Sequence, residues 1–410
     1  MPDHPALLPE ANSRAIPKIT VVELDTDPHG MFRRYREEVP FLERADGPYI
    51  VLRARDVEAL ITDPRTRQLE TELMQSRGIT SGPIFDMHGN SMLFSNDAVH
   101  RKRRAPMSRT FAFRAVASLR PQIRAVAEKL IDARLFQGGM NLIDDYTALI
   151  PARAIAGILG LPEEDVPSFT GWVYSFSRSL NTSFATADIP DITQAAGQLQ
   201  AYVERLIAER RVAPRDDFLT DFIRLTDDAG ELSPLEAVAQ LVVVILAGSD
   251  TTRAAMAIQV ALLLQDRAQW DAVCADPALI PGAVSEALRY EPSVGSVPRF
   301  TATDIVIDGY VVPAGRILSL STLSAMRDPA VYVDPDRFDI RRTDHPRWHM
   351  VFGGGPHRCL GEALARMELE EGLAALAARL PGLKLSGPPL RVHGSSAIRR
   401  IDPLHVTWPR

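Results

Sequence analysis

The sequence predicts a mainly α-helical fold that also contains small β-sheets, a fold of the α+β class. One apolar segment, residues 233–265, keeps helical spacing for about 30 residues, or ~45 Å, which is long enough to cross a whole domain. Pairs of short apolar runs separated by turn residues, near residues 41–52 and 305–320, predict small sheets. With 46% apolar and 24% charged residues, the chain can build a large core around the long helix.

We expect a single domain over residues 1–410, because no linker, repeat or low-complexity segment divides the chain. Residues 1–18 lack the apolar core of a signal peptide and are expected to form a flexible N-terminal segment. The longest apolar run falls far short of the ~20 residues of a membrane span. Only two cysteines, Cys274 and Cys359, are present, and a disulfide between them is not expected. These features favour a cytoplasmic protein that does not bind a membrane, and the net charge of −6 argues against nucleic-acid binding.

Near the N-terminus, residues 41–44 and 49–52 are predicted to be strands joined by a turn at Asp46-Gly47, and residues 55–61 a helix. Residues 75–96 show little periodicity. We expect an irregular loop there, which is either functional or a mobile surface loop.

A cluster of basic residues follows on a probable helix. Its members are His100, Arg101, Lys102, Arg103, Arg104, Arg109 and Arg114. The cluster is either a solvated helix face or a site for an anion or a partner protein.

Helical spacing continues over residues 144–160 and again over residues 192–211. Between them, residues 168–184 mix aromatic side chains such as Trp172 and Phe176 with serines. The pattern alone leaves open whether these aromatic side chains face the core or a pocket.

The long central helix opens with Ser233-Pro234-Leu235-Glu236, a capping box with proline at the first helical position. Polar residues interrupt its apolar middle in the run Ala247-Gly248-Ser249-Asp250-Thr251-Thr252. One interpretation is a local kink with threonine bonded back to the preceding turn. The other is a buried proton relay, which would use the same acid and hydroxyl groups.

Further along, Glu286 and Arg289 lie three residues apart and therefore on one helix face. Residues 305–307, 310–312 and 317–320 are predicted to be short strands, and residues 383–408 a small terminal sheet.

The loop Phe352-Gly353-Gly354-Gly355-Pro356-His357-Arg358-Cys359-Leu360-Gly361 delivers a cysteine to the start of a strongly helical segment. Consecutive glycines allow backbone conformations that other residues avoid. The positive end of the helix dipole and free N–H groups favour a thiolate at Cys359, either as ligand to a soft metal centre or as nucleophile.

The pattern Phe352, Gly355, Cys359 and Gly361 resembles the haem-ligand loop of the cytochromes P450, the haem-thiolate monooxygenases, and motif order and spacing are similar to the bacterial soluble members over nearly the whole chain. The resemblance implies a single-domain triangular prism with its long helix over haem b and Cys359 as the iron ligand. It further implies a haem-binding set made of His100, Arg104, Ala247, Gly248, Arg299, Phe352, Gly353, His357, Cys359 and Gly361. Arginine and histidine suit the haem propionates because they form charge-assisted hydrogen bonds with carboxylates.

The resemblance also implies roles for other residues. Asp250, Thr251 and Thr252 would activate oxygen, and Glu286, Arg289 and Arg337 would form a buried structural ion triad. The substrate pocket would be lined by Met92, Leu93, Phe94, Trp172, Phe176, Val243, Ala247, Val294, Val297 and Ala397. A redox partner would dock on Arg101, Lys102, Arg103, Arg109, Arg114 and Arg358.

The implied activity is a monooxygenase that uses O2 to hydroxylate a small-to-medium, mostly apolar organic substrate. Electrons would come from NAD(P)H through a reductase and an acidic ferredoxin. The alternatives are a non-enzymatic haem-thiolate binding or sensor protein and a peroxide-driven haem-thiolate enzyme.

Overall fold

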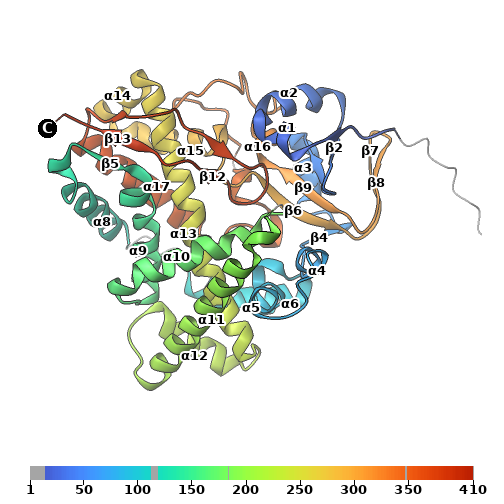
Figure 1. Ribbon diagram of the computed structural model, residues 1–410, viewed down its shortest axis with the longest axis horizontal. Coiled ribbons are helices and arrows are strands. Elements are labelled where there is room, and N and C mark those ends of the chain that lie inside the picture. Colours follow the sequence, from blue (N-terminus) through green and yellow to red (C-terminus); the bar gives the residue numbers. More distant parts are fainter. Residues whose placement is uncertain (1–13, 112–118, 183, 347–348, 410) are drawn as a thin grey trace, which may run out of the picture.

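The long helix α13 (Pro234–Gln265) lies at the centre of the structure, with other helices packed along it (Figure 1). The computed structural model describes residues 14–111, 119–182, 184–346 and 349–409. The predicted capping box starts the helix, since the Ser233 hydroxyl accepts the Glu236 amide and the Glu236 carboxylate accepts the Ser233 amide. By length and hydropathy α13 could cross a membrane, but 78% of its most apolar window is buried inside the protein, as expected of a core helix.

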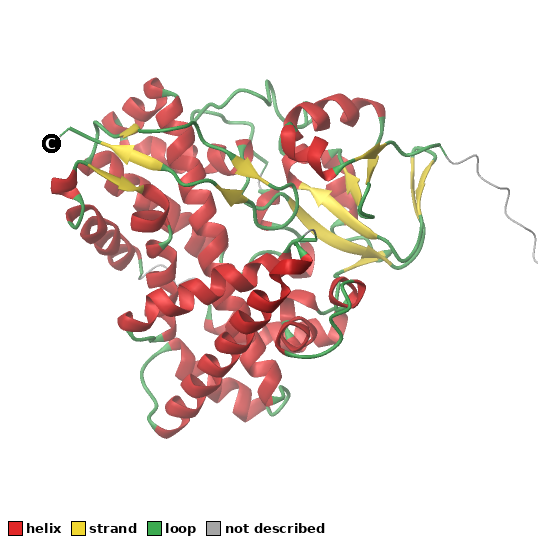
Figure 2. Cartoon of the chain, in the orientation of Figure 1, coloured by secondary structure: helices red, strands yellow, loops and turns green. Residues whose placement is uncertain are grey.

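Most of the other helices fill the left and lower parts of Figure 2. The α-helices are α1 (Val21–Thr26), α2 (Pro28–Glu38), α3 (Ala54–Leu60), α4 (Glu72–Ser76), α5 (Pro83–Asn90), α6 (Asp97–Thr110), α8 (Arg120–Asp132), α9 (Leu149–Leu159), α10 (Val166–Ser177), α11 (Ile189–Val212), α12 (Phe218–Ala229), α14 (Arg267–Ala275), α15 (Ile280–Tyr290), α16 (Thr322–Ala325) and α17 (Glu362–Arg379). Short 3-10 or π turns are η1 (Met92–Phe94), η2 (Leu135–Gln137), η3 (Ile143–Thr147), η4 (Glu163–Asp165), η5 (Arg178–Leu180), η6 (Thr186–Asp188), η7 (Pro277–Leu279), η8 (Met350–Phe352) and η9 (Gly355–His357). Helices α1, α2, α3 and α16 lie beside the large sheet at the upper right of Figure 2.

The largest sheet has six strands in the order β1-β2-β3-β9-β6-β4, at the right of Figure 1. Its strands are β1 (Lys18–Ile19), β2 (Phe41–Arg44), β3 (Tyr49–Val51), β9 (Ile317–Ser321), β6 (Ser296–Thr301) and β4 (Thr66–Arg67). The predicted hairpin β2–β3 is confirmed, with Leu42 opposite Ile50 and Gly47 in its turn at φ +119°.

Smaller sheets complete the fold. They are β7 (Ile305–Ile307) with β8 (Tyr310–Val312), β11 (Val392–His393) with β12 (Arg400–Ile401), and β10 (Lys384–Leu385), β13 (His405–Thr407) and β5 (Gly139–Asn141) in the order β10-β13-β5. The terminal sheet therefore recruits a strand from the middle of the chain, which local pattern did not indicate.

Two large hydrophobic cores and one small cluster stabilise the described part of the chain. The largest core surrounds α13, and the second lies between the six-stranded sheet and helices α1, α2, α3 and α16. The small cluster is formed by Ile258, Leu262 and Ala287. The outline in Figure 1 is roughly triangular, in agreement with the predicted prism of helices with small sheets.

The prediction of an irregular loop over residues 75–96 is wrong. This stretch contains the end of α4, all of α5 and η1, and glycines with positive φ, Gly78 at +75° and Gly82 at +86°, separate α4 from α5. Proline at the first position of α5 and burial of Ile84 and Met87 favour a short helix that the sparse periodicity concealed. Of the expected flexible N-terminal segment, residues 1–13 lie outside the described part of the chain.

Candidate active site

The loop that carries Cys359 is held by its own backbone. The Cys359 amide donates to the Phe352 carbonyl at 2.8 Å, and the Arg358 amide donates to the Gly355 carbonyl at 3.1 Å. Gly355 has φ +61°, and a Cβ there would lie 2.7 Å from Cγ2 of Thr62. Glycine is therefore required both by the backbone and by the close approach of the loop to the end of α3.

The Cys359 thiol faces a cavity and is accessible from it, although it lies deep inside the protein. This burial raises the pKa of Cys359, while the Gly361 amide, which donates to the sulfur, opposes the rise. Glu362 raises the pKa further, and Arg104 and Arg358 lower it. A bound metal ion would take the thiolate form, since ligating cysteines are deprotonated.

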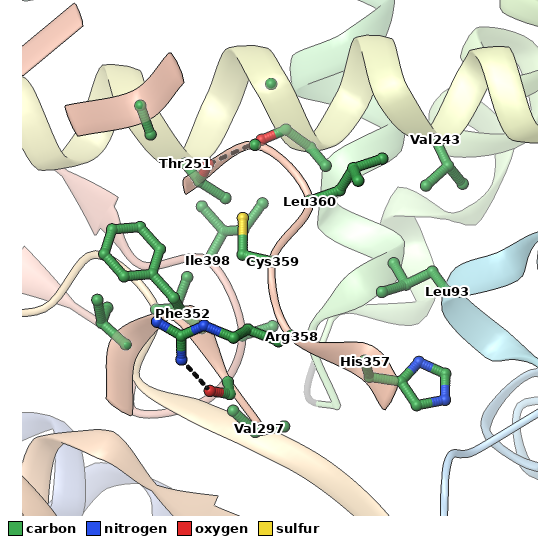
Figure 3. A pocket seen from close by; sticks show the side chains of 18 of the residues that line it. Leu93, Val243, Thr251, Val297, Phe352, His357, Arg358, Cys359, Leu360 and Ile398 are labelled. Atoms are coloured by element: carbon green, nitrogen blue, oxygen red, sulfur yellow. Dashed lines mark hydrogen bonds between the residues drawn. The ribbon is translucent and has the colours of Figure 1, made fainter. Parts of the chain in front are cut away.

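The cavity has a volume of about 320 Å3 and lies between the Cys359 loop and α13 (Figure 3). The structure brings most of the predicted pocket residues to its wall. They are Met92, Leu93, Phe94, Val243, Ala247, Val294, Val297 and Ala397. Figure 3 shows the Cys359 sulfur pointing up toward Thr251 of α13.

Trp172 and Phe176 are corrections to the predicted pocket, because neither side chain belongs to the described cavity wall. The Trp172 ring packs against Tyr202 of α11 at 5.9 Å between centroids, and the Phe176 ring packs against His88 of α5 at 6.2 Å. Both aromatic side chains therefore stabilise packing between helices, and Leu180, just beyond α10, reaches the cavity.

Pocket residues that sequence reasoning missed include Ile155, Ser293, Ser296 and Glu368. Glu368 is 1% exposed, and neither carboxylate oxygen has a hydrogen-bond partner in the described residues. Burial raises its pKa to about 8, against a smaller opposing effect of Thr252. One signal could have found it, since Glu368 lies four residues after the buried Leu364 and therefore on the same helix face.

In the polar run of α13, Gly248, Thr251 and Thr252 line the cavity, and the run does not interrupt the helix. The Thr251 hydroxyl donates to the Ala247 carbonyl at 2.8 Å, which is the bond back to the preceding turn that the structural alternative predicted. A Cβ on Gly248 would lie 2.4 Å from Cδ1 of Ile155. The glycine thus permits close packing of α13 on α9.

Asp250 is 4% exposed and does not face solvent. Its carboxylate accepts a hydrogen bond from Ser177 of α10 at 2.6 Å and pairs with the Arg253 guanidinium, whose Nε lies 2.8 Å away. Arg253 in turn lies over the Tyr174 ring at 4.4 Å. The acid of the predicted relay is therefore held by α10 and by its own helix.

The four predicted propionate-binding residues converge on one side of the cavity. The His100 and His357 rings lie 4.0 Å apart, and Arg104, Arg299 and His357 line the wall. The Arg104 guanidinium donates to the Arg358 carbonyl at 2.6 Å. Burial lowers the pKa of His100 to about 4, with smaller effects of nearby arginines, and lowers that of Arg299 to about 10.

These residues fit the haem that the sequence resemblance implies. The cluster presents only hydrogen-bond donors and imidazoles, and the buried Nε2 of His100 lacks a partner among the described residues. A pair of carboxylates would supply the missing acceptors and negative charge. On the same loop as His357, Cys359 offers a single thiol to a metal.

The predicted ion triad needs a correction at Arg337. Glu286 and Arg289 are fully buried and joined by two bonds of 2.7 and 2.8 Å. The Arg337 side chain is 68% exposed and lies 3.7 Å from Asp339 instead. Arg342 is the third member, with its Nε 3.2 Å from Glu286. Arg337 contributes only its carbonyl, which accepts from Arg289 and Arg342.

Of the residues predicted to bind the redox partner, some are exposed and others are buried or paired inside the protein. Arg103 is buried and pairs with Glu236 of the α13 capping box at 2.9 Å, and Lys102 pairs with the same carboxylate. Both therefore fasten α6 to α13, which corrects the expectation that they form a docking face. Arg101 and Arg109 are exposed. Arg358 pairs with Glu362, and Arg114 lies outside the described residues.

Comparison with known proteins gives consistent matches. The cytochrome P450 family model matches residues 277–380. The plant-inducible cytochrome P450-pinF1 of Rhizobium radiobacter is 45% identical over 388 residues, which cover 95% of this chain and 92% of the relative. The mycinamicin IV hydroxylase/epoxidase of Micromonospora griseorubida is 33% identical, covering 93% of this chain and 97% of the relative. The crystal structure of the myxobacterial CYP267B1 in complex with myristic acid superimposes with a TM-score of 0.86 at 32% identity, covering 94% of this chain and 98% of that chain.

Proposed function

The chain belongs to the cytochrome P450 family and is a monooxygenase that uses haem iron and O2, and from this premise we propose the chemical class of its substrate and its electron supply. The substrate is a small-to-medium, mostly apolar organic molecule, which the enzyme hydroxylates. Electrons come from NAD(P)H through a ferredoxin reductase and an acidic ferredoxin. The observation that carries the proposal is the Cys359 thiol facing an apolar cavity across from Thr251.

Different residues of this chain are proposed to bind the iron and the propionates of the haem. Bound haem supplies the iron at which O2 is activated. Cys359 would bind the iron, and His100, Arg104, Arg299 and His357 would bind the propionates. The hydrogen bonds that hold the Cys359 loop keep the sulfur in place without motion of the loop.

Thr251 and Asp250 are proposed to deliver protons to dioxygen. The Thr251 hydroxyl would turn from the Ala247 carbonyl toward the cavity, where it can hold a water molecule. Asp250 would pass a proton to that water after its pairing with Ser177 and Arg253 loosens. Because Ser177 belongs to α10, movement of α10 relative to α13 would open this route.

The cavity wall supports the substrate class. Apart from the residues assigned to haem and protons, its polar side chains are Gln68, Ser293, Ser296, Arg358 and Glu368, and most other lining residues are apolar. An apolar skeleton with few polar groups therefore suits the site. One relative is named for hydroxylation and epoxidation of mycinamicin IV, and one similar structure holds the long-chain myristic acid, which agrees with a mostly apolar organic substrate.

The electron supply rests on exposed positive charge. Arg101 and Arg109 project from α6, whose Arg104 contacts the Cys359 loop, so an acidic ferredoxin that docks there would lie close to the sulfur. We place the reaction in the cytoplasm, where such carriers and NAD(P)H are available.

The first experiment is a spectrum of the ferrous protein with CO. We expect the red-shifted Soret band of thiolate ligation, which Cys359→Ala should lose and the matched variant Cys274→Ala should keep. An unshifted band in folded wild-type protein would contradict the assignment of Cys359. A screen of macrocyclic and fatty-acid compounds for spin-state shifts, followed by product analysis with NAD(P)H and a ferredoxin system, tests the substrate class. Shifts confined to charged, polar compounds would refute it.

A further inference from the structure

Glu362, at the start of α17, joins two arginines that lie on either side of Cys359 in sequence. One carboxylate oxygen lies 2.5 Å from the Arg358 guanidinium, and the other lies 3.4 Å from the Arg366 guanidinium. The three side chains are only 22–28% exposed, so water screens this cluster less than it screens a surface pair. One negative charge is thus shared between two positive charges.

Both arginines also contact groups that hold the ligand loop. The Arg358 guanidinium donates to the Gly353 carbonyl at 3.2 Å (Figure 3). The Arg366 guanidinium lies over the Phe352 ring at 5.0 Å, and the Phe352 carbonyl accepts the Cys359 amide. The cluster therefore lies against the loop that holds the sulfur, and the charges of Glu362 and Arg358 act on the Cys359 thiol itself.

The ordinary role of an acid at this position is to stabilise the positive end of the helix dipole. That role involves neither arginine. Instead, one carboxylate oxygen of Glu362 contacts Arg358 and the other contacts Arg366. This arrangement indicates that Glu362 offsets the positive charge of both arginines near the Cys359 loop.

We propose that Glu362 is a positioning residue that offsets the charge of Arg358 and Arg366 beside the Cys359 sulfur and thereby sets the reduction potential of the haem iron. This inference rests on the proposed ligation by Cys359. Reduction adds one electron to the iron and thiolate unit, and nearby positive charge stabilises that electron. Hydrogen bonding and charge around the sulfur are known levers on such potentials.

The test measures the reduction potential of haem-loaded protein by spectroelectrochemistry, without a redox partner. Glu362→Gln should raise the potential, because two positive charges lose their offset. Arg366→Gln should lower it, and the double variant should return toward the wild type. We expect a change of roughly two- to tenfold in the ferrous-to-ferric ratio at a fixed potential, or about 18–59 mV for a one-electron couple.

Glu370→Gln is the matched control. Glu370 lies eight residues, or ~12 Å, further along the same helix than Glu362. Its side chain is 20% exposed and pairs with Arg120 at 2.8 Å, so its substitution should leave the potential unchanged. A structural disturbance would move the Glu362 and Arg366 variants in the same direction. That result, or a Glu362→Gln potential equal to that of Glu370→Gln, would overturn the inference.

The CO spectrum separates this inference from the function it rests on. Absence of the thiolate band in the wild type would overturn both. Thiolate bands in every variant together with unmoved potentials would overturn only the role of Glu362. Should Glu362→Gln fail to load haem, the downward shift predicted for Arg366→Gln still decides the question.

Discussion

Replacing Arg289 with leucine tests the buried ion network most directly. The Arg289 guanidinium makes two bonds to Glu286 and further bonds to the carbonyls of Met326 at 3.0 Å, Pro335 at 2.7 Å and Arg337 at 3.1 Å. Arg289→Leu would remove all of these hydrogen bonds, which lie in the protein interior. The network joins α15 to the irregular segment before the Cys359 loop, so its loss should weaken the frame that positions this loop.

The magnitude follows from what remains after the substitution. Breaking a buried ion pair costs about 3–5 kcal/mol. Glu286 would retain Arg342 at 3.2 Å and the Asp339 amide at 2.8 Å, which places the loss near the lower end of that range. Arg342→Leu should cost only about 1–2 kcal/mol, because Glu286 keeps both bonds to Arg289. Arg337→Leu, at an exposed side chain, should change stability by less than about 0.5 kcal/mol.

Thermal unfolding followed by circular dichroism measures this order. For 410 residues an unfolding entropy of ~0.9 kcal/mol/K converts 3–5 kcal/mol into a fall of about 3–6 °C in Tm for Arg289→Leu, with the lower end expected. Arg337→Leu is the matched control, with the same substitution and almost no expected shift. Equal Tm values for Arg289→Leu and Arg337→Leu would refute the reasoning, and so would a larger loss for Arg337→Leu.

Three further predictions concern the reaction and its surroundings. Thr251→Ala should still consume NAD(P)H but release hydrogen peroxide in place of product, because the variant lacks the hydroxyl that holds water for proton transfer. Asp250→Asn should slow oxygen consumption itself. Measuring product per NAD(P)H oxidised, with Thr251→Ser as control, checks this. The pKa of Glu368 is raised to about 8 in the folded protein, whereas a glutamate in the unfolded chain has a pKa near 4.5. Between these two pH values the folded protein therefore keeps a proton that the unfolded chain has released. Between those two pH values this group lowers stability by up to ~1.4 kcal/mol for each unit of rising pH, and Glu368→Gln should remove that slope, as measured by urea unfolding at pH 5.5 and 7.5. Arg109→Glu should slow reduction by an acidic ferredoxin without altering substrate binding, and the wild-type rate should fall with salt because exposed charges are screened beyond ~10 Å at about 0.1 M.

Each of these three predictions has an outcome that would contradict it. Unchanged coupling in Thr251→Ala would leave its bond to Ala247 as its only role. An unaltered pH slope in Glu368→Gln would mean that another group titrates. Equal reduction rates for Arg109→Glu and for a charge reversal at the exposed Arg224 of α12 would leave the α6 face as solvated surface.

Local features of this protein were predictable from the sequence because they depend on neighbours in the chain. The capping box at Ser233 and Glu236 starts α13 where predicted, and the turn at Gly47 joins β2 to β3. The glycines and Cys359 of the loop likewise lie within ten residues, so Cys359 could be predicted as the ligand from a local motif, without any tertiary information.

Tertiary structure decided the partners of the polar and aromatic side chains. The family resemblance predicted Arg337 as the partner of Glu286, and only the path of the chain in the folded protein shows that Arg342 reaches the carboxylate instead. The rotation of α10 about its axis turns Trp172 toward Tyr202 and away from the cavity. Ion pairs and pocket walls are made by segments far apart in sequence, and their geometry is set by the packing of whole helices, which no local pattern encodes.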